Sequence, residues 1–174
     1  MFFDFLFGRK QSQPAPVPTP QPSAAEPRAP GTQIAYNAEL VGQLKAEHQK
    51  LLGIFAAIKG AFERGDNSET ARQLEEFRSA IQGHLLLENV RLYIYLEHAL
   101  AQDAESHTLV RAFRHEMDGI GRAVLDFLGK YKDIGSQPNL AASFGGELDR
   151  IGEVLVARIR REEETLYPLY LPAY

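Results

Sequence analysis

A histidine and a glutamate four residues apart stand in the apolar stretch HLLLENVRLYIYLEH, which begins at His84. On an α-helix, side chains at this spacing share one face. His84 and Glu88 would therefore point together into a helical core, where an imidazole and a carboxylate are unfavourable unless a partner satisfies them. A bound metal ion is one such partner, and a hydrogen-bonded ion-pair network is another.

The elements that must position this pair are helices, because apolar residues recur at steps of three and four along the chain. We expect four helices: from near Asn37 to the turn at residues 65–67, from near Ser68 to about Ala101, from Asp103 or Ser106 to before Gly135, and from near Pro138 to Pro168. Long helices with short connections predict an all-α fold, an up-down-up-down four-helix bundle over residues 33–174.

Two different segments precede the predicted bundle. Residues 1–10 form a Phe-rich tip with the apolar side chains Phe2, Phe3, Phe5, Leu6 and Phe7. Residues 11–32 form a Pro-rich linker whose composition predicts a disordered, extended tail. The tip carries its basic residues after a short apolar part, the reverse of a secretory signal peptide. It is expected either to dock onto a protein groove or a membrane surface, or to fold back or fray.

The composition narrows the classes of function. The chain has no cysteine, which excludes disulfides, thiolate metal sites and cysteine catalysis. Its formal charge is -4 and it has no long basic run, so we do not expect nucleic acid as a partner. No apolar run reaches the roughly 18 residues of a membrane span. We therefore expect a cytoplasmic protein, with peripheral membrane contact through the tip as an alternative.

An internal repeat links the second and fourth predicted helices. The stretch HLLLENVRLYI, which begins at His84, aligns with RIRREEETLYP, which begins at Arg158. The alignment places Glu162 opposite Glu88, and a Leu-Tyr pair follows in both stretches. Two related helical hairpins would give such a repeat.

With His48 in the apolar seam of the first predicted helix, this pattern resembles the hemerythrin-like family, the HHE cation-binding domains, over about residues 36–172. In that family a histidine on helix one, His-x-x-x-Glu on helix two, a histidine on helix three and a second His-x-x-x-Glu on helix four hold a di-iron site. The site serves oxygen binding, iron handling, or redox and oxygen sensing. The resemblance implies one or two iron ions, or zinc, with His48, His84, Glu88 and Glu162 among the ligands.

Two positions depart from the family pattern. Arg158 stands at the histidine position of the fourth helix, and a guanidinium is permanently cationic and cannot ligate a metal. On the third helix, the apolar periodicity places Glu116 at the family's histidine position and His115 on the polar face. The expected inward set is therefore His48, His84, Glu88, Glu116, Arg158 and Glu162.

These side chains allow three interpretations. In the first, the fork of Arg158 pairs with two carboxylates and replaces the charge of a metal, leaving a buried network without metal. In the second, His48, His84, Glu88 and either Glu116 or Glu162 bind a single divalent ion. In the third, Arg158 turns outward and two metals bind.

The function expected on the first interpretation is a non-catalytic binding or regulatory module with a degenerate metal site. The other two predict an iron-binding oxygen or redox sensor, or an oxygen-binding protein. The sequence offers no nucleophile constellation and no phosphate-binding loop, so we do not expect an enzyme. Any catalysis would have to come from the metal itself.

Overall fold

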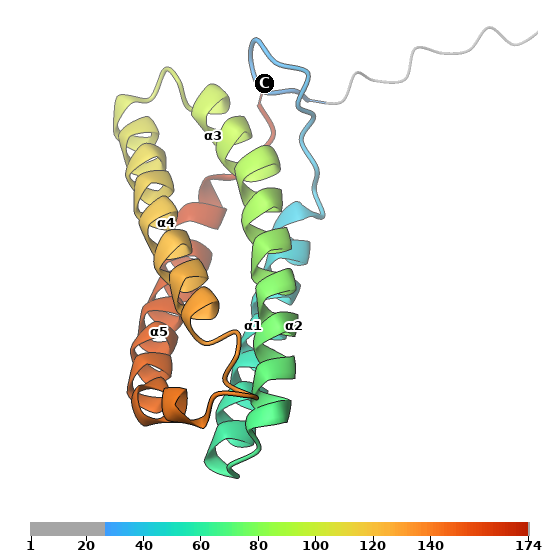
Figure 1. Ribbon diagram of the computed structural model, residues 1–174. Helices are drawn as coiled ribbons and strands as arrows, with labels where there is room; N and C mark the ends of the chain where they lie inside the picture. The colour runs from blue at the N-terminus through green and yellow to red at the C-terminus, as the bar shows by residue number, and fades with distance from the viewer. Residues whose placement is uncertain (1–26, 174) are drawn as a thin grey trace, which may run out of the picture.

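The computed structural model describes residues 27–173, which form four long helical segments (Figure 1). The first is α1 (Leu40–Glu63). The second is one continuous run of α2 (Asn67–Leu87), the π-helical turn η1 (Glu88–Tyr93) and α3 (Ile94–Ala99). The third is α4 (Ala104–Lys130). The fourth contains the 3-10 turn η2 (Pro138–Leu140), α5 (Ala141–Arg161), the π-helical turn η3 (Glu162–Leu166) and the 3-10 turn η4 (Tyr167–Leu169).

Successive segments run in opposite directions along one bundle (Figure 1). Within residues 27–173 there is no β-strand, and an isolated bridge joins Arg28 to Ala35. The predicted all-α, up-down-up-down fold is therefore confirmed. The Phe-rich tip and residues 11–26 of the linker lie outside the described residues.

Local chemistry explains where the helices begin and end. The side chain of Asp66 accepts a hydrogen bond from the backbone N–H of Glu69 at 3.0 Å and caps α2, and Asp103 caps α4 in the same way. Gly65 closes α1 with a φ of 72°, a left-handed conformation that glycine adopts without strain. These residues lie in or beside the turns that the sequence predicts.

The core consists of two apolar clusters, with a buried polar group between them. In α1, His48 lies between Leu44 of one cluster and Leu51 of the other. In the fourth helical segment, Arg158 likewise lies between Leu155, which belongs to the cluster of Leu51, and the residues of the cluster that contains Leu44. Apolar packing above and below thus encloses these polar side chains within the bundle. No helix within residues 27–173 is long and apolar enough to cross a bilayer.

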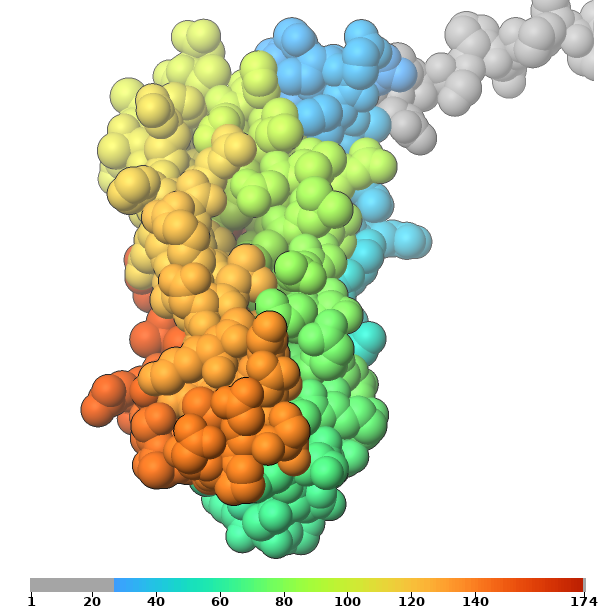
Figure 2. Space-filling model, viewed as in Figure 1, coloured from blue at the N-terminus to red at the C-terminus, as the bar shows by residue number. Residues whose placement is uncertain are grey.

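The segment before α1 packs against one end of the bundle, beside α2 and α3 (Figures 1 and 2). Ala29 is buried in the second apolar cluster, and the Tyr36 ring stacks on that of Tyr170 with centroids 5.0 Å apart. The Tyr170 hydroxyl accepts a hydrogen bond from the backbone N–H of Asn37 at 3.0 Å. Packed structure therefore begins upstream of the predicted domain boundary at residue 33.

Candidate metal centre

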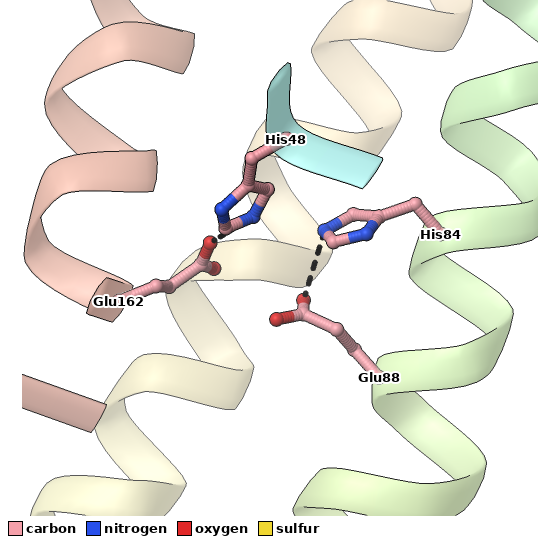
Figure 3. Close-up of side chains that lie close together, drawn as sticks. All are labelled: His48, His84, Glu88 and Glu162. Atoms are coloured by element: carbon pink, nitrogen blue, oxygen red, sulfur yellow. Dashed lines mark ion pairs between the residues drawn. The ribbon is translucent and has the colours of Figure 1, made fainter. Parts of the chain in front are cut away.

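Four buried side chains converge between the two apolar clusters (Figure 3). His48 comes from α1, His84 from α2, Glu88 from the start of η1 and Glu162 from the start of η3. One nitrogen or oxygen atom of each lies within 4.8 Å of the others. The two histidine–carboxylate pairs of the group are His48 Nε2 to Glu162 Oε2 at 3.3 Å and His84 Nε2 to Glu88 Oε2 at 3.9 Å.

Both carboxylates of this group stand at the first residue of a π-helical turn. Glu88 opens η1 and Glu162 opens η3, at matching positions of the internal repeat. Single π-helical turns inside α-helices occur frequently at functional sites. They also place a tyrosine five residues after each glutamate against the centre. The apolar periodicity of the sequence predicts neither turn.

The two tyrosines that follow these turns form hydrogen bonds with side chains at the centre. Tyr167 donates a hydrogen bond from its hydroxyl to Glu88 Oε1 at 2.9 Å, and the Tyr167 hydroxyl oxygen lies 3.2 Å from His48 Nε2. Tyr93 accepts a hydrogen bond from Arg158 Nη2 at 2.7 Å. Burial raises the pKa of both phenols above the ordinary value, so both stay protonated.

Each histidine is held from outside by a further carboxylate. His48 Nδ1 lies 2.9 Å from Glu163 Oε1, and His84 Nδ1 lies 3.0 Å from Glu47 Oε2. An Nδ1–H that donates to a carboxylate orients the ring and leaves Nε2 as the atom that can ligate a metal. Helical periodicity assigns Glu47 and Glu163 to the polar face, so the sequence predicts neither contact.

In the metal-free protein, the pKa values of His48 and His84 are shifted in opposite directions. Burial lowers the pKa of His48, but hydrogen bonds to Glu162 and Glu163 outweigh it and leave the pKa above its ordinary value. The pKa of His84 lies below its ordinary value, because burial and the nearby His48 outweigh the hydrogen bond to Glu47. A metal would therefore compete with a proton at His48.

Glu88 carries the clearest sign of a missing positive partner. Its Oε2 is buried and has no hydrogen-bond partner among residues 27–173. Burial, together with the charge of Glu162, raises the pKa of Glu88 to about 8. A buried carboxylate oxygen without a donor is unfavourable, and a cation would satisfy it. Two imidazole nitrogens and two carboxylates form a donor set that suits zinc or iron.

Arg158 lies inside the bundle and is fully engaged with protein groups. Its Nε donates to Glu162 Oε1 at 2.5 Å, its Nη1 to Glu116 Oε2 at 3.0 Å, and its Nη2 to the carbonyl oxygen of Phe113 at 3.0 Å as well as to Tyr93. The guanidinium carbon also lies 4.7 Å from the centroid of the Phe113 ring. The two-metal interpretation required the Arg158 side chain to turn outward. The structure instead shows this side chain pointing into the bundle.

Glu116 lies outside the four-residue group. Its side chain is 40% exposed, and its carboxylate accepts hydrogen bonds from Arg158 and, at 2.6 and 2.8 Å, from Arg161 Nη1. Met117 is the buried residue of this turn and borders the same cavity as His48 and His84. The sequence-based prediction of Glu116 as the inward residue, three positions after Phe113, is therefore wrong. The inward residue of this turn is Met117, four positions after Phe113. His115 is exposed, on the polar side as predicted.

A family model described as the hemerythrin HHE cation-binding domain matches residues 39–170. The chain belongs to this family. No curated protein sequence and no solved structure matches it.

This hemerythrin-like bundle combines two kinds of position. His48, the His84–Glu88 pair and Glu162 stand where the family pattern has metal-binding residues, and the structure brings them together. Two further side chains lie buried beside this group: Met117, the inward residue of its turn of α4, and Arg158. These two side chains carry a thioether and a guanidinium, and a guanidinium cannot ligate a metal.

Proposed function

We propose that this hemerythrin-like protein binds one divalent metal ion, zinc or iron, through His48, His84, Glu88 and Glu162, and that Arg158 supplies the charge of a second cation. The observation that carries the proposal is Glu88 Oε2, a buried carboxylate oxygen without a protein donor that faces His84 Nε2. A bound cation would satisfy this oxygen. It would also use the Nε2 atoms that Glu47 and Glu163 orient.

Glu162 supports a single ion rather than two. Its Oε1 is occupied by Arg158 Nε, whereas its Oε2 lies 3.3 Å from His48 Nε2 and faces the other ligands. The carboxylate is thus shared between a fixed guanidinium and the candidate metal position. The charge of Arg158 and the hydrogen bonds from both partners overcome the effect of burial and hold the pKa of Glu162 below its ordinary value.

The role we propose for the ion is regulatory rather than catalytic. An ion at this position would join α1, α2, η1 and η3 at the middle of the bundle, and binding energy available only to the folded state stabilises that state. Metal occupancy would then set the stability of the domain. The Phe-rich tip, at Phe2, Phe3, Phe5, Leu6 and Phe7, is the proposed docking segment for a protein or membrane partner.

An iron-dependent oxygen or redox sensor is the second candidate function. It is favoured by a cavity of about 410 Å³ that borders His48, His84 and Glu162 and would give small molecules access to the ion. Iron would supply the redox chemistry. A change in visible absorbance when the anaerobically iron-loaded protein meets air supports this candidate, and an unchanged spectrum contradicts it.

Zinc binding to the full-length chain tests the main proposal. We expect isothermal titration calorimetry to show one site, and Glu88→Gln to weaken binding by about tenfold or more because one charged ligand is lost. Glu164→Gln is the matched control, since Glu164 pairs with Arg160 on the exposed face of the same helical segment. Equal affinities of the Glu88→Gln and Glu164→Gln variants would contradict the proposed ligand set.

Deletion of residues 1–10 tests the docking role separately. The deletion should abolish association with cell membranes or with a captured partner while the thermal stability of the domain stays unchanged. Unchanged association would contradict a docking role for the tip and would leave the metal site unaffected.

A further inference from the structure

Glu88 presents one of its two carboxylate oxygens to the candidate metal centre. Its Oε1 accepts a hydrogen bond from the Tyr167 hydroxyl at 2.9 Å. Its Oε2 has no protein donor among residues 27–173 and lies 3.9 Å from His84 Nε2 (Figure 3). The glutamate and the tyrosine are both buried, so water does not compete for this hydrogen bond. The Tyr167 hydroxyl therefore determines which oxygen of Glu88 faces the centre.

Glu162 is restricted in a similar way. Its Oε1 accepts a hydrogen bond from Arg158 Nε, and its Oε2 lies 3.3 Å from His48 Nε2. Each carboxylate thus gives one oxygen to a protein donor and directs the other at a histidine. The atoms that remain for an ion are four: one Nε2 from each histidine and one Oε2 from each glutamate.

A set of four nitrogen and oxygen donors suits some divalent ions better than others. Zinc is commonly bound by four such ligands, whereas Mn²⁺, Mg²⁺ and Ca²⁺ take six or more ligands that are mostly oxygens. A carboxylate that binds through both oxygens is one way to reach the higher number. The hydrogen bond from Tyr167 withholds the second oxygen of Glu88, and this disfavours the ions that need it.

We propose that Tyr167 is a specificity-determining residue of the centre, which favours zinc over Mn²⁺ by limiting Glu88 to one ligating oxygen. The inference rests on the proposed single-ion site. Tyr167 is a positioning residue, because it acts through Glu88. Tyr167→Phe keeps the buried ring and removes the donor, so the Glu88 carboxylate becomes free to bind an ion through both oxygens.

Tyr93 offers a matched control. It stands at the position of the internal repeat that matches Tyr167, and it is also buried. Its hydroxyl accepts a hydrogen bond from Arg158 instead of donating one to a candidate ligand. Tyr93→Phe therefore removes a buried hydroxyl from the same region without freeing an oxygen of Glu88.

The affinities of the full-length wild type and of both variants for zinc and for Mn²⁺, measured by competition with a chelating dye, test the inference. Zinc binds more tightly than Mn²⁺ to most sites of this kind, so the informative quantity is the change in the ratio of the two affinities. We expect this ratio to fall about tenfold in Tyr167→Phe and to stay near the wild-type ratio in Tyr93→Phe. An unchanged ratio in Tyr167→Phe, or an equal fall in both variants, would overturn the inference and leave the metal site intact. A wild type that binds no zinc would instead overturn the proposed function, and this inference with it.

The visible spectrum of Co²⁺ bound in place of zinc reports the number of ligands, which a change in stability alone does not alter. Six-coordinate Co²⁺ absorbs weakly because its nearly centrosymmetric surroundings suppress the d–d transitions, and four-coordinate Co²⁺ absorbs much more strongly. We expect strong absorption in the wild type and in Tyr93→Phe, and weaker absorption in Tyr167→Phe. Weak absorption in the wild type, or the same spectrum in all three proteins, would overturn the inference.

Discussion

Arg158 and Glu162 form a buried ion pair one helical turn apart at the end of α5, with Arg158 Nε donating to Glu162 Oε1 at 2.5 Å. The family pattern has a histidine and a glutamate at these two positions. A guanidinium there provides positive charge and directional donors but no metal-ligating lone pair. The single-ion centre proposed above follows from this pair, because Glu162 keeps one oxygen for the remaining ligands.

Truncation of Arg158 should destabilise the metal-free protein strongly. Arg158→Ala would leave Glu162 buried beside one fewer cation and the carbonyl of Phe113 without its donor, and breaking a buried ion pair in this way costs about 3–5 kcal/mol. Urea denaturation gives the free energy of unfolding. Arg160→Ala removes an exposed pair with Glu164 and should cost less than about 1 kcal/mol. A similarly small loss for Arg158→Ala would mean that this side chain reaches water.

A second metal position should form when histidines are placed at the inward positions of α4 and α5. We expect Arg158→His combined with Met117→His to raise the zinc stoichiometry above that of the wild type. The sequence alone would have suggested Glu116→His as the second change, but Glu116 points to Arg161 at the edge of the bundle. The Glu116→His combination should therefore stay at the wild-type stoichiometry. The reverse ranking of the two double variants would show that the face of α4 is assigned incorrectly.

The outer carboxylates should tune metal affinity without ligating the ion. Glu47→Gln and Glu163→Gln each replace the acceptor of a histidine Nδ1–H by a neutral amide, and such changes typically weaken metal binding about 10–100-fold. Competition with a chelating dye measures the affinity. The exposed Glu164→Gln is again the control. Wild-type affinity in both variants would show that the histidine orientation does not depend on these carboxylates.

The stability of the metal-free protein should fall as the pH rises from about 5 to 8. Glu88 has a pKa of about 8 in the folded protein and 4.5 as its ordinary value, so over this interval the folded state holds a proton that the unfolded chain has lost. The slope is at most about 1.4 kcal/mol per pH unit for one proton. The raised pKa of His48 acts in the same direction, and the lowered pKa of His84 acts against it just below the ordinary value of 6.5. The lowered pKa of Glu162 acts below 4.5.

Comparison with Glu88→Gln isolates this contribution. The neutral amide does not titrate, so unfolding free energies measured in urea at pH 6 and pH 8 should differ less in this variant than in the wild type. An equal difference in both proteins would assign the pH dependence to other groups.

The fold follows from the sequence because its signals are local. Steps of three and four place apolar residues on one helix face, and Asp66 and Asp103 begin helices where short polar residues interrupt that pattern. The interior position of His48 in α1 follows from the same seam. That such inward residues bind a metal stays a prediction.

The errors at the site also have a physical origin. On α4, a step of three from Phe113 reaches Glu116 and a step of four reaches Met117, and periodicity alone does not choose between them. A π-helical turn contains more residues than an α-helical turn and rotates the residues that follow it. Tyr167 therefore reaches Glu88, although its spacing from Glu162 does not suggest contact with the centre. Glu47 reaches His84 from a different helix, a contact that no local pattern shows.

The metal content of the full-length protein tests the central claim most directly. The protein would be loaded anaerobically with ferrous iron, or with zinc, freed of unbound ion and analysed by elemental mass spectrometry. We predict one ion per chain, with less bound metal in Glu88→Gln, whose affinity is expected to be weaker. Two ions per chain would contradict the role of Arg158 as the second cation, and a metal content near zero would contradict the metal site itself.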